Sequence, residues 1–153
     1  MIVYRLSKSR HAKDLSGKGA EKFGGRWNSK GVAMVYTSDS RALCTAEIAV
    51  HTPLGNLPVD YEMAVIHIPD NTIIPELDPS ELPPDWNSVP HSHGTQVIGD
   101  NFVSDDQFLV LKVPSAVVQG EFNYLINPAH DDFKSISIEK TEPFAFDKRL
   151  FTR

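Results

Sequence analysis

Apolar residues along the chain recur in short runs that are typical of strands, with only two stretches at helical spacing. The runs predict strands over residues 1–6, 33–37, 59–68, 108–113 and 133–139. Residues 115–118 are expected to continue the fourth strand after a bend at Pro114, and residues 122–126 lead into the turn at Asn127-Pro128. Pro69 ends the third strand, and a proline-rich, acidic segment over 69–90 then crosses the molecule with one helical turn near 80–82.

The clearest helix is predicted over residues 41–51. Ser38, Asp39 and Ser40 are all good candidates for its N-cap. One face of this helix is apolar, formed by Ala42, Leu43, Ala46, Ala49 and Val50. At 100° per residue, Glu47 lies at the rim of that face. A carboxylate there is costly unless it has a bonding partner or a functional role.

The remaining helical signals are weaker. Residues 91–103 form a second candidate helix despite two glycines, and the long polar segment over 7–25 is expected to contain a short helix. Strands outnumber helices and do not alternate with them regularly. We therefore predict one α+β domain over residues 1–153 rather than a doubly wound fold.

Charge is distributed unevenly along the 153 residues. Residues 1–30 hold eight Lys and Arg against Asp14 and Glu21, a balance of +6, so the remainder sums to −11 for the net −5. A basic N-terminal fifth indicates a site for an anion such as a phosphate or pyrophosphate. The alternative, a solvated loop, applies best to Lys13, Lys18 and Lys22. The acidic remainder disfavours a broad nucleic-acid surface.

The composition also argues against several classes of protein. A single cysteine, Cys44, excludes an internal disulfide framework and is expected to be buried as a small hydrophobic residue. No apolar run approaches the length of a membrane span, and the N-terminus lacks the order of a signal peptide, so we expect a cytoplasmic protein with no membrane partner.

Three side chains suited to a small-molecule site fall within twenty-two residues. Arg26 follows two glycines, which let the backbone approach a ligand closely, Tyr36 ends the apolar run over residues 32–36, and Glu47 lies in the predicted helix. Two of them have a structural alternative: Tyr36 as a buried strand tyrosine, and Glu47 in a salt bridge with Arg41 or a lysine. Trp27 either stacks on a ligand ring or belongs to the core, and the core is the commoner role.

The histidines do not predict a metal site. His91 and His93 have a spacing that places both imidazoles on one face of a strand, but no further ligand stands at a recognisable distance along the chain. His130 follows a turn and is expected to bond the backbone. The sequence also lacks a serine-hydrolase elbow, a phosphate-binding Walker loop and a dinucleotide-binding glycine fingerprint.

Several motifs, in order along nearly the whole chain, resemble the RES-domain family, the toxins of Xre–RES toxin–antitoxin pairs. They are Tyr4-Arg5, residues 25–28 (GRWN), residues 35–38 (VYTS), Ala46-Glu47, residues 113–117 (VPSAV), residues 123–130 (NYLINPAH) and residues 144–150 (FAFDKRL). Each motif alone is weak, and their order carries the resemblance.

The resemblance implies a fold similar to ADP-ribosyltransferases, with short, mostly antiparallel strands around a central NAD cleft. It implies that NAD is the substrate, rather than a cofactor, and that its nicotinamide–ribose bond is broken. The implied catalytic residues are Arg26, Tyr36 and Glu47, supported by Ser115. Besides Arg26 and Tyr36, the implied NAD-binding residues are Arg5, Trp27 and Asn127. By comparison, Asn123 and His130 are interpreted as structural.

The resemblance also implies a cognate Xre-like antitoxin as partner, with nucleic acid reached only through that partner. The acceptor of ADP-ribose is water or phosphate, or alternatively a protein side chain. Two rival hypotheses remain: a module that binds an adenine nucleotide without chemistry, and a toxin that acts on nucleic acid through residues 5–30.

Overall fold

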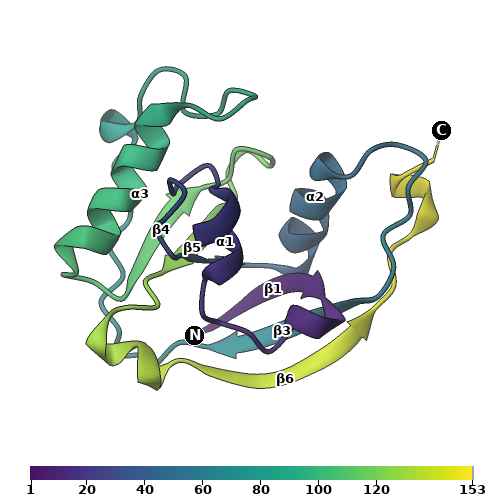
Figure 1. Cartoon of the computed structure of the whole chain (residues 1–153), viewed down its shortest axis with the longest axis horizontal. Coiled ribbons are helices and arrows are strands. Elements are labelled where there is room, and N and C mark those ends of the chain that lie inside the picture. The colour runs from purple at the N-terminus through teal and green to yellow at the C-terminus, as the bar shows by residue number, and fades with distance from the viewer. Residues whose placement is uncertain (153) are drawn as a thin grey trace.

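The computed structural model describes residues 1–152, which form a single six-stranded sheet with three α-helices (Figure 1). The strands are β1 (Ile2–Lys8), β2 (Val35–Ser38), β3 (Tyr61–His67), β4 (Val110–Pro114), β5 (Phe122–Ile126) and β6 (Ser137–Phe144). Their order across the sheet is β4-β5-β2-β1-β3-β6, and every paired neighbour is antiparallel. This confirms the predicted α+β class.

The helices are α1 (Lys18–Phe23), α2 (Arg41–His51) and α3 (His93–Asp105). Figure 1 shows them above strands β3 and β6, with α1 between α3 and α2. Helix α2 has the predicted bounds, and Ser40 is its N-cap because the side chain accepts a hydrogen bond from the backbone N–H of Leu43. None of the helices within residues 1–152 is long and apolar enough to cross a membrane.

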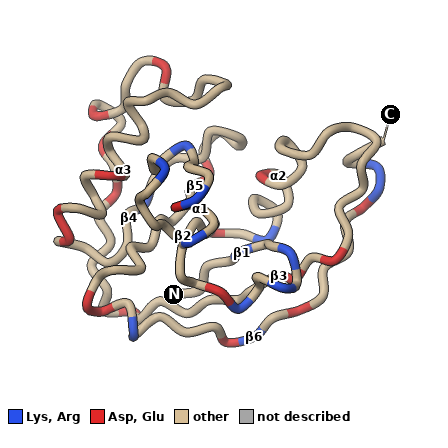
Figure 2. The backbone as a smooth tube through the Cα atoms, viewed as in Figure 1, with Lys and Arg blue, Asp and Glu red and all other residues tan. Residues whose placement is uncertain are grey.

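Charged residues follow the uneven distribution expected from the sequence. Figure 2 shows Lys and Arg gathered around β1 and the segment that carries α1, whereas acidic residues lie along α3. The basic N-terminal segment therefore lies over the centre of the sheet. It is close to the strands whose sequences resemble the motifs of the RES-domain family.

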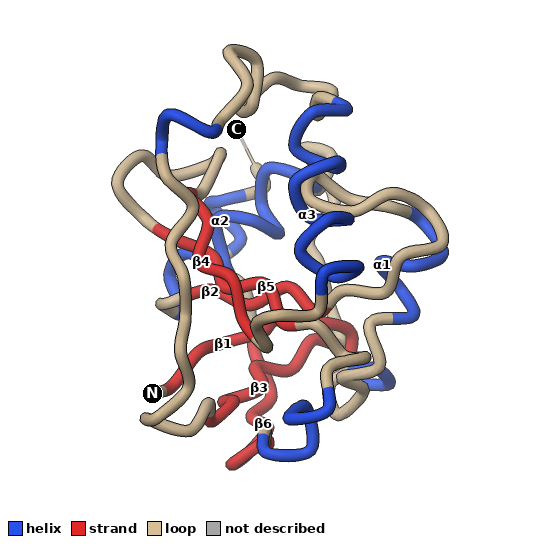
Figure 3. Tube along the Cα trace, turned by 90° about the vertical axis from the view of Figure 1, so that its left-hand side faces the viewer, coloured by secondary structure: helices blue, strands red, loops and turns tan. Residues whose placement is uncertain are grey.

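The sheet is strongly twisted, and it parts at its centre (Figure 3). Strand β1 pairs with β3 at seven positions, from Ile2 to Lys8. It pairs with β2 at one position only, Tyr4 opposite Ser38. Beyond that pair the two strands diverge, and the sheet leaves room for a cleft between them.

The proline-rich segment protects one edge of the sheet. The N–H of Leu77 donates to the carbonyl of Lys112, and the N–H of Lys112 donates to the carbonyl of Pro75, so residues 75–77 cover edge strand β4. The predicted helical turn in this segment is present as a 3₁₀ turn over Pro79–Glu81.

Two predicted strand boundaries are wrong. Residues 115–118 form a turn, because the Ser115 hydroxyl accepts the N–H groups of Val117 and Val118. The last strand begins at Ser137, since Asp131–Ser135 is a 3₁₀ helix. His130 caps that 3₁₀ helix by accepting the N–H of Asp132, which agrees with its predicted structural role.

Candidate active site

Three of the predicted site residues, Arg5, Tyr36 and Glu47, line a cleft at the centre of the sheet. One cavity of about 200 Å³ lies between the diverging strands β1 and β2, against α2 and β5. A second, of about 170 Å³, lies between β2 and the segment that begins α1. Arg5 and Tyr36 line both cavities, so the two form one extended cleft. Two larger cavities, of about 360 and 540 Å³, are lined by none of the predicted site residues.

Glu47 lies on the α2 wall of this cleft. Its Oε1 accepts hydrogen bonds from Ser115 Oγ at 3.0 Å and from Asn123 Nδ2 at 2.9 Å. Its Oε2 has no hydrogen-bond donor among residues 1–152. The alternative of a salt bridge with Arg41 does not apply, because Arg41 pairs with Glu142 at 2.8 Å. The carboxylate is therefore held through one oxygen and keeps the other free.

Ser115 is held so that its single proton goes to the carboxylate. It is 4% exposed and begins the turn after β4. Its oxygen already accepts two backbone N–H groups, each at 3.1 Å, so the hydroxyl hydrogen remains for Glu47. The supporting role of Ser115 in catalysis stays a prediction. In the structure, the residue that Ser115 supports is Glu47.

Asn123 lies in the site, contrary to its interpretation as a structural residue. It lines the 200 Å³ cavity, donates to Glu47, and accepts from Ser38 Oγ at 2.8 Å. It lies directly opposite Ser38 in the pairing of β2 with β5. A sequence signal did exist, because Asn123 is the one amide in the otherwise apolar and aromatic strand β5.

Arg26 is presented by a loop that the buried side chain of Asn28 and the Gln96 side chain of α3 hold in place. Asn28 is fully buried, and its Nδ2 donates to the carbonyls of Ala20, Ser29 and Val32. The N–H of Gly25 donates to the carbonyl of Asn28 at 2.9 Å. A Cβ at Gly25 would lie 2.7 Å from the Tyr36 hydroxyl oxygen, so the close approach requires glycine.

The guanidinium of Arg26 is half-buried and is held by the distant proline-rich segment. Its Nη1 donates to the carbonyls of Trp86, at 2.8 Å, and Ser88, at 3.1 Å. Burial lowers the pKa of Arg26, while the negative charge of Glu47 opposes that shift. The group stays charged at neutral pH because arginine starts from so high a value. Its Nε and Nη2 have no acceptor among residues 1–152.

The hydroxyl of Tyr36 is committed to the arginine loop. It accepts the N–H of Trp27 at 3.0 Å and donates to Asn28 Oδ1 at 2.6 Å. Burial raises the pKa of the Tyr36 phenol, so the group is protonated over the whole physiological range. Tyr36 also lines both cavities, while its hydroxyl is bonded within the arginine loop.

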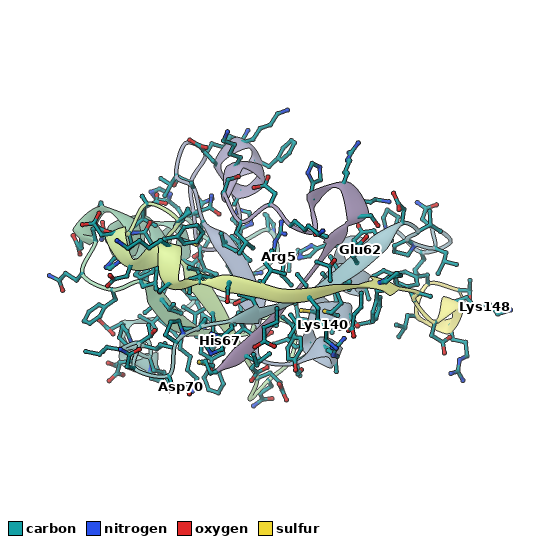
Figure 4. All side chains as sticks on the ribbon, turned by 90° about the horizontal axis from the view of Figure 1, so that it is seen from below. Arg5, Glu62, His67, Asp70, Lys140 and Lys148 are labelled. Carbon is teal, nitrogen blue, oxygen red and sulfur yellow. The ribbon has the colours of Figure 1, made fainter. Side chains whose placement is uncertain are left out.

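Arg5 lies near the middle of the sheet (Figure 4). Its Nη1 donates to the carbonyl of His11 at 3.1 Å and lies 3.4 Å from Ser7 Oγ. Burial lowers the pKa of Arg5, and the nearby carboxylate of Asp14 works in the opposite direction. Arg5 lines the cleft, and Arg26 lies near enough to Glu47 for their charges to interact, so two arginines of the basic N-terminal segment are at the site.

The structure does not bring Trp27 or Asn127 to the cleft. Trp27 is 2% exposed and packs in the core with Met34, Leu111 and other apolar residues, so the core alternative describes it. Asn127 is fully buried, and it donates to Asp106 Oδ1 at 2.9 Å and accepts the N–H of Ala129. It braces the loop after β5 against the end of α3.

The paired histidines lie outside the cleft. His93 is the first residue of α3, and His91 precedes the N-cap Ser92. Within residues 1–152, no three His, Cys, Asp or Glu side chains are grouped closely enough to hold a metal ion. The charged side chains that line the cleft are those of Arg5, Lys18, Asp14 and Glu47.

Known proteins resemble this chain over most of its length. The chain is 38% identical over 144 residues to the "Prs ADP-ribosylating toxin" of Sphingobium sp. (strain YBL2), which covers 93% of this chain and 89% of that protein. It is 39% identical over 152 residues to a "Toxin Res" of Photorhabdus laumondii, covering 98% and 97%. A "Toxin Res" of Yersinia enterocolitica is 38% identical over 152 residues, covering 98% and 99%.

The fold has a counterpart among solved structures. A chain of the M. tuberculosis MbcT–MbcA toxin–antitoxin complex superposes with a TM-score of 0.75 over 98% of this chain and 86% of that one, at 22% sequence identity. The family model described as the RES domain matches residues 2–147. This match spans the cleft and every residue of it described above, and the chain belongs to the RES-domain family.

Proposed function

We propose that this protein is the toxin of a toxin–antitoxin pair and that it breaks the nicotinamide–ribose bond of NAD. The observation that carries the proposal is the state of Glu47. One carboxylate oxygen is fixed by two donors, the other has no donor in the described part of the chain, and the group lines a cleft that also holds Arg5. The relatives that are named toxins support the biological role.

The side chains suit an oxocarbenium-like transition state. Nicotinamide leaves as a neutral ring from a positively charged glycosidic nitrogen, so the step needs no general acid. Positive charge then develops on the ribose, and a fixed carboxylate nearby stabilises it. We assign that role to Glu47 Oε2. Ser115 and Asn123 hold the carboxylate in advance, so little reorganisation is required during the reaction.

The arginines suit the pyrophosphate of NAD. An arginine can bind phosphate oxygens through two parallel N–H groups. Because Trp86 and Ser88 occupy only Nη1 of Arg26, its Nε and Nη2 keep their donors for a ligand. Arg5 lines both parts of the cleft and is the second candidate phosphate ligand. Tyr36 contributes its ring face as a stacking surface.

The proposal covers two reactions, which differ in the acceptor of ADP-ribose. With water or phosphate as acceptor, the products are nicotinamide and either ADP-ribose or a phosphorylated ADP-ribose. With a protein side chain as acceptor, the chain is an ADP-ribosyltransferase. The second reaction is favoured by one observation, the name of the Sphingobium relative. Mass spectrometry of the products formed with water alone, with phosphate and with a cell lysate separates the three acceptors.

An enzyme that drains NAD needs an inhibitor in its own cell. We assign this role to an Xre-like antitoxin that covers Arg26 and blocks NAD entry, with any contact to nucleic acid made by the antitoxin. The likeness to a chain of a toxin–antitoxin complex supports such a partner. An acidic segment of the partner would complement the two arginines of the cleft.

Growth assays test the toxin role, and turnover tests the occlusion. Expression of this chain in the bacterial cytoplasm, its proposed location, should arrest growth, and co-expression of the neighbouring antitoxin should relieve the arrest. The purified complex should release nicotinamide far more slowly than the free protein. A complex that turns over NAD at the free rate would refute occlusion, while leaving the reaction itself intact.

A further inference from the structure

Ser38 stands where the central strands part. It is 5% exposed, lies opposite Tyr4 in the single registered pair between β1 and β2, and lies opposite Asn123 in the pairing of β2 with β5. Its hydroxyl donates to Asn123 Oδ1 at 2.8 Å. The same asparagine donates from Nδ2 to Glu47 Oε1. Two successive hydrogen bonds therefore connect Ser38, at the point where β1 and β2 diverge, with the carboxylate of Glu47.

The direction of these hydrogen bonds matters, because a side-chain amide has a donor end and an acceptor end. With Nδ2 toward Glu47, the carboxylate receives a hydrogen bond. With the amide turned over, Oδ1 would face Glu47 Oε1, and two acceptors would meet at a distance suited to a hydrogen bond. The carboxylate can only accept, so it selects the first orientation, and the Ser38 hydroxyl then donates to Oδ1 and restrains the amide from its other end; successive bonds of this kind strengthen one another.

We propose that Ser38 is a positioning residue for the reaction: its hydroxyl fixes the Asn123 amide so that Nδ2 holds Glu47 in place. The inference rests on the proposed function, in which Glu47 stabilises the developing charge. Without the Ser38 hydroxyl, the Asn123 amide loses the bond at its Oδ1, so it holds Glu47 less firmly and the carboxylate can shift relative to the ribose.

The test compares three variants with the wild type. Ser38→Ala removes the hydroxyl. Ser38→Thr restores it, and the added methyl group has the adjoining cavity to occupy. Thr95→Val is the matched control, because Thr95 is also buried and its hydroxyl donates to a backbone carbonyl, that of Ser92, in a different part of the fold. All four proteins are prepared by cell-free synthesis with ¹⁵N label.

Two readouts are recorded for each protein: the side-chain amide signals of Asn123 by NMR, and the kinetics of nicotinamide release. In Ser38→Ala we expect the Asn123 amide signals to move toward those of a free amide. We also expect kcat to fall about 10–100-fold, the scale of a small misplacement of a reacting group, with KM for NAD changed less than about twofold. Ser38→Thr should restore both readouts, and Thr95→Val should change neither.

Three outcomes would overturn the proposal: unchanged Asn123 signals in Ser38→Ala, an unchanged kcat in that variant, or an equal loss in Thr95→Val. The two proposals fail separately. If the wild type releases no nicotinamide, the assigned reaction is wrong, and the amide signals still decide whether Ser38 orients Asn123.

Discussion

The side-chain nitrogen of Asn123 lies 2.9 Å from Oε1 of Glu47, and this contact joins strand β5 to helix α2 across the cleft. The two residues are 76 positions apart in the chain. Together with Ser115, the asparagine holds one carboxylate oxygen and leaves the other for a ligand. A carboxylate used only for stability would be expected to pair with a neighbouring cation, as Glu142 does with Arg41.

Replacing Tyr36 with phenylalanine should loosen the loop that presents Arg26. The Tyr36 hydroxyl satisfies both the Trp27 N–H and Asn28 Oδ1, so its loss leaves two buried polar groups without a partner. We expect the free energy of unfolding to fall by about 1–3 kcal/mol. Urea unfolding measures it. Tyr61→Phe is the control, since its hydroxyl makes no hydrogen bond within the described residues, and equal losses in the two variants would contradict this role.

Replacing Arg26 with lysine should weaken NAD binding. The three donors of a lysine share one nitrogen, so a lysine that bonds the carbonyls of Trp86 and Ser88 cannot also bind a phosphate through two parallel N–H groups. Loss of one charge-assisted hydrogen bond, about 1.5–3 kcal/mol, raises Kd about 10–100-fold. Calorimetry on proteins that also carry Glu47→Gln measures the affinity without consuming NAD.

The matched control for this change is Arg149→Lys, at an exposed arginine paired with Asp147. It should leave the affinity for NAD unchanged. If the Arg26→Lys protein binds NAD as tightly as its parent, Arg26 serves the structure of the loop and not the ligand.

Cys44 should react slowly with alkylating reagents although it lines the cleft. Burial raises the pKa of its thiol to about 11. A higher pKa means less thiolate, so at pH 8 the reactive fraction is about one in a thousand, against roughly a quarter for an unperturbed cysteine. Iodoacetamide labelling followed by mass spectrometry measures the rate, and this is the only cysteine in the chain.

The labelling rate of the folded protein is interpreted by comparison with two other rates, that of the unfolded protein and that in the presence of NAD. The unfolded protein in urea should react at the rate of a free thiol, and NAD should slow labelling of the folded protein further. A folded protein that reacts as fast as the unfolded one would show that the thiol is exposed, and the cleft wall described here would be wrong.

Local patterns predicted the elements and several site residues well. The spacing of apolar residues in α2 gave its bounds and placed Glu47 at the rim, because a helix period maps directly onto a face. The glycines before Arg26 were expected to let the backbone approach a ligand; the structure shows Gly25 close to the Tyr36 hydroxyl, and the approach to a ligand stays a prediction. These features depend on neighbours within one element, and the sequence displays such neighbours directly.

Contacts between distant segments could not be predicted in this way. Arg26 is held by carbonyls about sixty residues further along the chain, and backbone carbonyls leave no mark in a sequence. Asn123 reaches Glu47 only because β5 pairs with β2 in one particular register. Trp27 was ambiguous because an aromatic residue beside an arginine suits a ligand or a core equally well, and tertiary packing placed it in the core.

The central claim is that Glu47 drives cleavage of NAD, and release of nicotinamide tests it most directly. Purified wild-type protein and Glu47→Gln are incubated with NAD, and free nicotinamide is quantified by chromatography while circular dichroism verifies that both are folded. We predict release by the wild type and a rate about 10²–10³-fold lower for Glu47→Gln, as expected when one preorganised charge is lost. Binding of NAD without release by the wild type, or equal release by a folded Glu47→Gln protein, would contradict the account.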